Sequence, residues 1–284
     1  MSDLFDFKPQ SKSYAVMGNP ISHSKSPTIH SLFAQQCDIS LQYDRVQVDI
    51  GGFEQAVSHF QAHDGAGLNI TVPFKVDAWQ LCEKPNNRLS SRAYLAQSVN
   101  TLKFESDGSI YGDNTDGFGM VHDIQHNIGY SLSNKNVLII GAGGAVRGVL
   151  GPLLECLPRS VTIANRTSSK AHELAEQFDN PLLTPTSLTK TNPDGYDLII
   201  NGSAASLSNE LPGIESHCVH SETVIYDMMY ASQPTLFMKW SLSHGAIRAF
   251  DGLGMLVEQA AEAFFVWHNQ RPDTKSVIEL LRKR

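Results

Sequence analysis

The sequence predicts an α/β protein of two domains, the second built on a doubly wound parallel sheet. Two observations lead to this fold class. Short, wholly apolar runs recur along the second half of the chain with helical patterns between them, which is typical of parallel strands buried on both faces. A chain of 284 residues also suits two domains of ordinary size, each able to bury a core without disulfides.

In the first part of the chain, strands are predicted at residues 13–18, 41–50, 68–72, 100–105 and 109–112. The last two flank Asp107-Gly108, a strong signal for a hairpin turn. One helix is predicted to start at Ser26-Pro27, because proline suits the first helical position after a serine cap. Two more are predicted from Gly52 to about His63 and over residues 75–82.

From Phe118 the pattern changes to apolar runs at residues 137–140, 160–164, 196–200, 223–226 and 246–250, which we predict to be parallel strands. Helices are predicted at about 118–127, 145–154 and 253–269, with another after Pro272. The last helices are free to return to the first domain. We therefore expect one domain from residues 1–115 together with 252–284, and a second from residues 116–251.

Composition excludes several classes of protein. A formal net charge of -7 argues against a nucleic-acid surface, which needs a basic field. No stretch approaches the roughly 18 consecutive apolar residues of a membrane span. The opening segment, MSDLFDFKPQSKS, has no basic stretch followed by an apolar run, so it is not a secretory signal. We expect a cytoplasmic protein.

The cysteines and histidines do not predict a metal site. The four cysteines are scattered without a CxxC pair, as expected of reduced thiols: Cys37, Cys82, Cys156 and Cys218. His217, Cys218 and His220 form a short cluster but lack a distant second pair of ligands. His122 and His126, four residues apart on a helix, are interpreted as solvated side chains.

A nucleotide-binding turn follows the apolar run VLII. Gly141 permits a tight strand-to-helix turn, and Gly143 lets the backbone approach a pyrophosphate at the helix N-terminus. The third glycine of the usual fingerprint is replaced by Val146, and we expect the small Gly144 and Ala145 to compensate for it. A strand before this turn and a helix after it predict a Rossmann-type dinucleotide domain.

The end of the next strand indicates which dinucleotide binds. An NAD site usually has Asp or Glu there to accept the ribose 2′-hydroxyl. This chain has Asn165, Arg166 and Thr167, with Lys170 one turn later. A guanidinium and an ammonium group suit a 2′-phosphate, which a carboxylate would repel. The sequence therefore predicts NADP as cofactor and hydride transfer as the chemistry.

The first domain carries polar motifs that suit a small ligand. The loop GNPISHSKSP places hydroxyls at alternate positions within a Gly/Pro frame. In NITVPFK, Asn69 and Thr71 are two residues apart, which would put them on one face of a strand, and Lys75 follows just past its end. VNT and DNTDG add an amide and a carboxylate near the domain junction. Such groups fit a small polyhydroxylated ligand, although loop polarity alone would produce part of the pattern.

Taken together, these motifs resemble those of the shikimate dehydrogenase family. GNPISHSKSP, NITVPFK, VNT, DNTDG, GAGGA, NRT, DMMY and DGLGMLVEQAA occur in the family's order and spacing, from about residue 13 to 263. The resemblance implies reversible reduction of 3-dehydroshikimate to shikimate by NADPH, on the route to aromatic amino acids. It also implies a discontinuous substrate domain and a cleft between the two domains that holds both ligands.

The resemblance also implies roles for individual residues. Lys75 would donate and accept the proton, and Asp116 would orient it and contact the substrate. The remaining implied substrate contacts are Ser22, Ser24, Asn69, Thr71, Asn100, Tyr230 and Gln259. The implied cofactor contacts are Gly141, Ala142, Gly143, Gly144, Ala145, Asn165, Arg166, Thr167, Ser168, Ser169, Lys170, Met228 and Gly252.

Three segments depart from the family pattern. The segment NGSAASL, residues 201–207, lacks the later glycine of the family's loop. Pro85-Asn86-Asn87 looks like an insertion, and Gln97-Ser98 replaces a small apolar pair. Local loop geometry is therefore open at these positions.

Two alternatives to this function remain. A quinate or broad shikimate/quinate dehydrogenase would need a pocket with room for one more hydroxyl. A catalytically silent NADPH-binding regulator is a different class, but it should have lost Lys75 or Asp116, and both are present. No nucleic-acid or membrane partner is expected, and both a monomer and a homodimer are compatible with the sequence.

Overall fold

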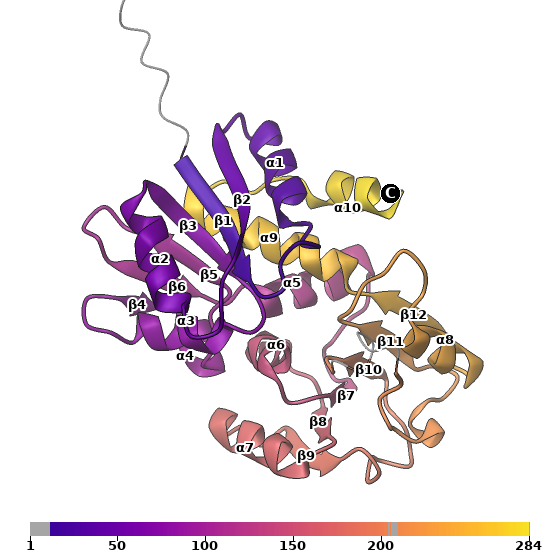
Figure 1. Cartoon of the computed structure of the whole chain (residues 1–284). Coiled ribbons are helices and arrows are strands. Elements are labelled where there is room, and N and C mark those ends of the chain that lie inside the picture. The colour runs from indigo at the N-terminus through magenta and orange to yellow at the C-terminus, as the bar shows by residue number, and fades with distance from the viewer. Residues whose placement is uncertain (1–11, 204, 206–209, 284) are drawn as a thin grey trace, which may run out of the picture.

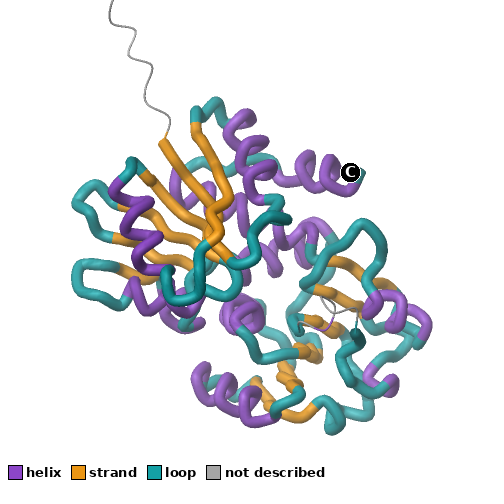
Figure 2. The backbone as a smooth tube through the Cα atoms, viewed as in Figure 1, coloured by secondary structure: helices purple, strands orange, loops and turns teal. Residues whose placement is uncertain are grey.

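The computed structural model describes residues 12–203, 205 and 210–283, which form two six-stranded sheets. The chain builds the first sheet from its indigo and purple segments before it builds the second (Figure 1). Figure 2 shows the two sheets in separate halves of the molecule, each with helices against it. The predicted α/β class is confirmed.

The first sheet has the strand order β2-β1-β3-β5-β6-β4. Its strands are β1 (Lys12–Gly18), β2 (Leu41–Gln47), β3 (Gly65–Ile70), β4 (Arg88–Leu89), β5 (Thr101–Phe104) and β6 (Ile110–Asp113). β1 is parallel to β2 and β3, whereas β5 and β6 form the antiparallel hairpin that was predicted. Gly108 closes the hairpin at φ +86°, a left-handed conformation that glycine adopts without steric cost.

One predicted strand boundary is wrong in a way that affects the site. β3 ends at Ile70, so Thr71 does not share a strand face with Asn69. The backbone N–H of Thr71 still bonds to the carbonyl of Met17, but Pro73 has no N–H to continue a ladder. Thr71 therefore lies in the loop that follows the strand.

Four helices connect these strands: α1 (Ser26–Gln36), α2 (Phe53–Ala62), α3 (Lys75–Cys82) and α4 (Ser91–Ala96). α3 has the bounds that were predicted. The predicted serine cap of α1 is wrong, because Lys25 occupies the cap position and no side chain caps the helix. Ser26 is already helical, and its N–H donates instead to Ser24 Oγ at 3.3 Å.

The second sheet is parallel throughout and has the order β12-β11-β10-β7-β8-β9. Its strands are β7 (Asn136–Ile140), β8 (Ser160–Asn165), β9 (Leu183–Ser187), β10 (Leu198–Asn201), β11 (Val224–Asp227) and β12 (Arg248–Asp251). This is the doubly wound order in which ligands bind where the winding reverses, at β7 and β10. The five predicted strands are confirmed, whereas β9 was not predicted.

The helices of the second half are α5 (Asp116–His122), α6 (Gly144–Glu155), α7 (Ser168–Phe178) and α8 (Leu236–Ser243). α5 continues into a π-helical turn, η1 (Asp123–Asn127), and a short 3-10 turn spans Ser216–Cys218. No helix in the described part of the chain is long and apolar enough to cross a bilayer.

The last two helices are α9 (Leu253–His268) and α10 (Thr274–Arg282). α9 lies against the first sheet and α1, and α10 packs against α9 (Figure 1). Phe264 of α9 packs against Ile29 and Phe33 of α1 in one buried cluster. Trp267 donates its indole N–H to the carbonyl of Leu102 at 2.9 Å. The end of the chain therefore completes the core of its beginning.

Candidate active site

Lys75 and Asp116 form an ion pair between α3 and α5. Lys75 is the first residue of α3 and Asp116 the first of α5. Their Nζ and Oδ2 atoms are 2.6 Å apart, and their side chains are 16% and 8% exposed. A nearly buried ammonium held by a carboxylate, yet still reachable from solvent, is an arrangement suited to proton transfer.

Asn100 connects this pair to a third element. Its Nδ2 lies 2.7 Å from Asp116 Oδ1, 2.9 Å from Thr115 Oγ1 and 3.3 Å from Gln259 Oε1. Gln259 belongs to α9, which explains why the returning helix matters for the site. Lys75, Asn100, Asp116 and Gln259, four of the predicted site residues, are thus brought into one network.

Asn69 lies beneath this network, with its amide engaged by other side chains. Its Oδ1 accepts from Tyr43 Oη at 2.6 Å, and its Nδ2 donates to Thr101 Oγ1 at 3.2 Å. The residue is 6% exposed. In this conformation Asn69 supports the neighbours of Asn100 and has little surface to offer a ligand.

The loop after β1 holds the predicted hydroxyl groups near the end of β3. Ser22 is exposed and Ser24 half-buried. A side-chain carbon at Gly18 would lie 2.5 Å from Thr71 Cγ2, so the two loops touch here. Tyr230 meets the same loop, because its ring centroid lies 5.5 Å from Lys25 Nζ.

The predicted nucleotide turn has the open backbone that a pyrophosphate needs. Gly141 has φ +111°, which favours glycine. Added side-chain carbons at Gly143 and Gly144 would meet no atom within 4 Å. No side chain caps the N-terminus of α6, so its N–H groups face this space. These residues fit a bound dinucleotide.

The replacement of the third glycine by Val146 is accommodated by Gly202, and the expected compensation by Gly144 and Ala145 is wrong. Val146 is fully buried where α6 crosses the end of β10. A side-chain carbon at Gly202 would lie 2.6 Å from Val146 Cγ2 and 2.9 Å from Met228 Sδ. The glycine that permits close packing is thus on the strand side of the contact, directly after β10, and no sequence signal indicated this role.

The remaining predicted cofactor residues lie at the ends of β8 and β11. Residues 166–170 are exposed, and Asn165 Nδ2 donates to the carbonyl of Thr167 at 2.9 Å, which shapes the turn. Arg166 and Lys170 therefore present their charges to solvent. Met228 packs against Gly252, where a side chain would collide with the Met228 carbonyl.

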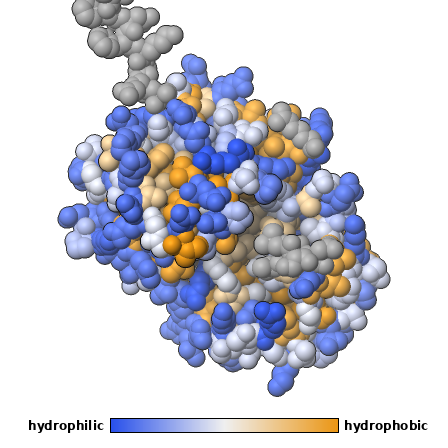
Figure 3. Space-filling model, viewed as in Figure 1, coloured by the Kyte–Doolittle hydropathy of each residue, from blue (hydrophilic) through white to orange (hydrophobic). Residues whose placement is uncertain are grey.

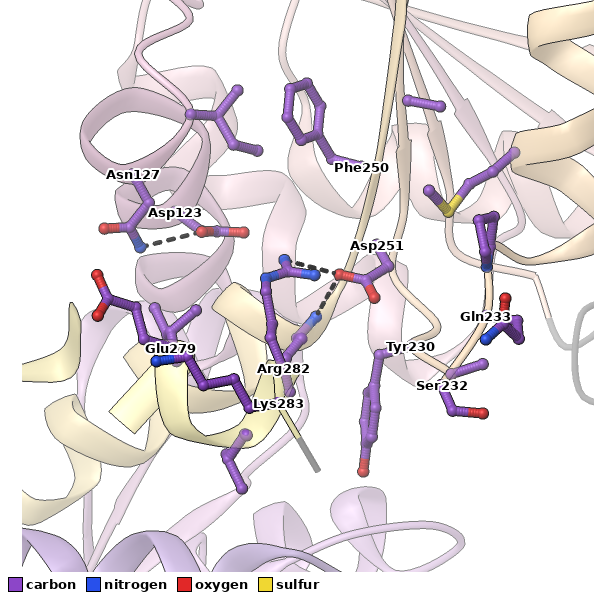
Figure 4. Close-up of a pocket in the computed structure, with 18 of the residues that line it drawn as sticks. Asp123, Asn127, Tyr230, Ser232, Gln233, Phe250, Asp251, Glu279, Arg282 and Lys283 are labelled. Atoms are coloured by element: carbon purple, nitrogen blue, oxygen red, sulfur yellow. Dashed lines mark hydrogen bonds and ion pairs between the residues drawn. The ribbon is translucent and has the colours of Figure 1, made fainter. Parts of the chain in front are cut away.

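A cavity of about 930 Å³ lies beside η1, β12, α10 and residues 230–234 (Figure 4). Its described lining does not include Lys75 or Asp116, but it does include Tyr230. Arg282 and Asp251 meet across it, with Nη2 and Oδ1 3.0 Å apart. Figure 3 shows a hollow where the two halves of the molecule meet.

The two helix histidines are not simply solvated, as was predicted. The rings of His122 and His126 stack at 4.2 Å, and His122 Nδ1 lies 3.1 Å from Glu258 Oε2. Cys218 is buried, with its Sγ 2.8 Å from Thr191 Oγ1. Within the described residues, no group of three or more His, Cys, Asp or Glu side chains is arranged to hold a metal.

The departures from the family pattern have partial structural explanations. In the insertion, Asn87 accepts the N–H of Ile110 at 2.9 Å and donates to the carbonyl of Leu81 at 2.9 Å, so it anchors the turn. Gln97 ends α4 in the left-handed conformation at φ +49°, and Ser98 is fully buried. In the segment that lacks the later glycine, residues 204, 206 and 207 lie outside the described residues.

Comparisons with known proteins agree with this geometry. Family models described as the shikimate dehydrogenase substrate binding domain, shikimate / quinate 5-dehydrogenase and the shikimate 5'-dehydrogenase C-terminal domain match residues 16–102, 123–210 and 252–282. A shikimate dehydrogenase (NADP(+)) of Marinobacter nauticus is 52% identical over 272 residues, which cover 95% of this chain and 98% of the relative.

Solved structures share the fold over nearly the whole chain. The crystal structure of an Ael1 enzyme from Pseudomonas putida has a TM-score of 0.89 and 42% identity, and covers 95% of this chain and 98% of its own. That of shikimate dehydrogenase from Aquifex aeolicus has a TM-score of 0.83 and 30% identity, with 96% and 97% covered. The chain belongs to the shikimate dehydrogenase family.

Proposed function

We propose that this protein is an NADP-dependent shikimate dehydrogenase, which reversibly reduces 3-dehydroshikimate to shikimate in the biosynthesis of aromatic amino acids. The observation that carries the proposal is the Lys75–Asp116 pair, at 2.6 Å, in a network with Asn100 and Gln259. Proton transfer to a reacting oxygen needs a group of this kind, positioned and shielded from bulk water.

The chemistry divides between the cofactor and the side chains. NADPH supplies the hydride when it is bound. Reduction of the ketone leaves charge on its oxygen, and Lys75 Nζ donates the proton that neutralises it; in the oxidation the same nitrogen removes that proton. Asp116 Oδ2 accepts a hydrogen bond from Lys75 and holds it in place, while Asn100 fixes Asp116 through its other oxygen.

The substrate site in this proposal includes Ser22, Ser24, Thr71 and Tyr230 in addition to the network. Hydroxyl groups at the loop after β1 suit the substrate's carboxylate. The buried amide of Asn69 supports the site indirectly, through its hydrogen bonds with Tyr43 and Thr101. Residues 1–115 with 252–284 form the substrate domain of this proposal.

The cofactor site in this proposal occupies residues 116–251, at the reversal of winding between β7 and β10. The open backbone at Gly143 and Gly144 receives the pyrophosphate, and the exposed Arg166 and Lys170 bind the 2′-phosphate. Met228 would pack against the nicotinamide, and Gly252 would also contact the cofactor. We also propose that the protein is cytoplasmic and acts as a monomer or a homodimer.

The decisive assay follows NADPH formation with shikimate and with quinate, each with NADP and with NAD. A kcat/KM at least about tenfold higher for shikimate with NADP is the expected result. A preference for quinate with NAD would replace this proposal by the broader dehydrogenase. Tight NADPH binding without turnover of either substrate would identify a silent regulator.

A further inference from the structure

Arg92 is a partly buried cation that joins two carboxylates from distant parts of the chain. It lies in α4, where its Nε and Nη2 donate to Asp113 Oδ1 and Oδ2 at 2.7 and 2.6 Å. Its Nη2 also donates to Glu262 Oε1 at 2.9 Å. The arginine side chain is 24% exposed and the two carboxylates are 3% and 8% exposed. Such enclosed, bidentate pairs fix geometry in a way that surface ion pairs do not.

Asp113 links Arg92 to Asp116 through hydrogen bonds of the residues between them. Its Oδ1 accepts from Ser90 Oγ at 2.5 Å and from the N–H of Asn114 at 2.7 Å. Asn114 in turn accepts the N–H of Asp116 at 3.2 Å and donates to the carbonyl of Ser98 at 2.9 Å. Asn114 and Thr115, the two residues between Asp113 and Asp116, are therefore both held by side-chain hydrogen bonds.

Glu262 links Arg92 to Gln259, because both Glu262 and Gln259 belong to α9. The two residues are three positions apart and lie on the same side of the helix. Arg271 holds the second oxygen of Glu262, with Nη2 and Oε2 2.7 Å apart. The Gln259 amide that contacts Asn100 is thus carried on a helix whose rotation is fixed by Arg92 and Arg271.

We propose that Arg92 is a positioning residue for the proton transfer, fixing Asp116 and Gln259 relative to Lys75. The inference rests on the proposed function, because it assigns a role within that reaction. Arginine is required, since its planar group presents several donors in a fixed fork, whereas lysine presents a single point charge. The sequence offered no signal for this role, since α4 itself was not predicted.

The test compares Arg92→Lys with the wild type. Displacement of Asp116 by a fraction of an ångström is expected to lower kcat for shikimate oxidation by roughly ten- to a hundredfold. KM for NADP should stay within about twofold, because Arg92 donates its hydrogen bonds to Asp113 and Glu262 and not to the nucleotide turn. Glu262→Gln removes the charge from the pairs with Arg92 and Arg271 but leaves the Arg92–Asp113 pair intact, so it should show the same pattern to a smaller extent. Wild-type kcat in Arg92→Lys would overturn the proposal.

Arg88→Met is the matched control. Arg88 precedes α4 and pairs with Glu105 at 3.3 Å, but its side chain is 65% exposed. Its loss should leave kcat unchanged, as expected for a surface pair. An equal fall of kcat in Arg88→Met would show a nonspecific effect of altering this part of the surface and would overturn the proposed role of Arg92.

A chemical rescue separates positioning from folding. A cavity of about 490 Å³ is lined by Arg92, Asp113 and Glu262, so Arg92→Ala should admit methylguanidine. Added methylguanidine is expected to restore part of kcat, and methylamine is not. Equal recovery of kcat with methylguanidine and with methylamine would overturn the proposal. A folded variant that neither compound reactivates would overturn it as well. Wild-type inactivity on shikimate would instead refute the proposed function itself.

Discussion

At the scale of single residues, the lysine of the proposed site is held by one oxygen of its carboxylate partner while the other is held by an amide. Asp116 Oδ2 faces Lys75 and Oδ1 faces Asn100. A carboxylate fixed at both oxygens cannot rotate to release its partner. The position of the ammonium group is therefore set before any ligand arrives, which lowers the reorganisation that proton transfer needs.

Replacement of Lys75 by alanine is expected to lower kcat by roughly two to four orders of magnitude with little change in KM for shikimate. The reason is that the proton donor is lost while the binding groups remain. Steady-state kinetics in both directions measure the effect. Lys84→Ala, which removes an exposed lysine paired with Glu54, is the control. Near-normal turnover of Lys75→Ala would contradict the role.

Replacement of Arg166 by alanine is expected to raise KM for NADP roughly tenfold or more and to leave KM for NAD nearly unchanged. Only NADP carries the 2′-phosphate that a guanidinium would bind. Arg159→Ala is a matched control, since Arg159 precedes the opposite end of β8 and bonds to Asn134. Equal effects on the two cofactors would show that Arg166 does not read the phosphate.

At the scale of elements, α6 approaches the second sheet over Gly202. Gly202→Ala is expected to destabilise the fold by about 1–3 kcal/mol and to weaken NADP binding, because the added carbon overpacks Val146. Thermal unfolding and cofactor titration measure both effects.

A double substitution tests this contact directly. Val146→Ala should recover most of the stability lost in Gly202→Ala, which would appear as a favourable coupling in the mutant cycle. Gly213→Ala is the control, because an added carbon there meets nothing within 4 Å and φ is not left-handed. Additive losses in the double variant would place the strain elsewhere.

How far the elements could be predicted depended on burial. β7 was predicted because the residues of VLII are apolar and its last four positions are buried. β9, with the sequence LTPTS, was missed because it is an edge strand that contains Pro185 and has no fully buried residue. Short apolar runs predict central strands, whereas edge strands lack that pattern.

The candidate site could likewise be predicted only in part. The pairing of Lys75 with Asp116, 41 residues apart, was inferred from resemblance to a family. That Asn100 reaches Asp116, Thr115 and Gln259 depends on the register of β5 and β6 and on the return of α9, which no local pattern encodes. The constraint through Arg92 depends on the same long-range packing.

At the scale of the whole molecule, hydrogen-bonded polar side chains form a buried junction between the two sheets. Asp123, in the π-helical turn, accepts from Tyr226 of β11 at 2.7 Å and from Asn127 at 3.0 Å. Asn127 also donates to Glu258 of α9 at 2.8 Å. A side-chain carbon at Gly254 would collide with Asp123. π-helical turns often mark functional sites, and this one joins both halves of the chain.

The pH dependence of stability should reflect this junction. The Glu258 carboxylate, which accepts a hydrogen bond from His122, raises the pKa of His122, whereas burial lowers it. Burial raises the pKa of Glu258, but hydrogen bonds from His122 and Asn127 hold it below its ordinary value. A raised histidine pKa contributes stability that is full below the unfolded value and lost as pH rises through the folded one.

His122→Gln should therefore lower Tm at about pH 6 and have a smaller effect at about pH 9. Thermal unfolding of both proteins across this range measures the difference. His172→Gln, on the exposed surface of α7, is the control. A difference that stays constant with pH would show that His122 acts by packing alone.

The return of α9 has a consequence for synthesis on the ribosome. Trp267 follows its partner Leu102 by 165 residues. At about 5–20 residues per second, it emerges on the order of ten seconds later. Throughout that interval the first sheet is translated but lacks the helix that covers Tyr14 and Val16. The second sheet can finish folding first, so the nascent chain must carry an unfinished, apolar half beside a completed one, and this is the stage at which aggregation competes with folding.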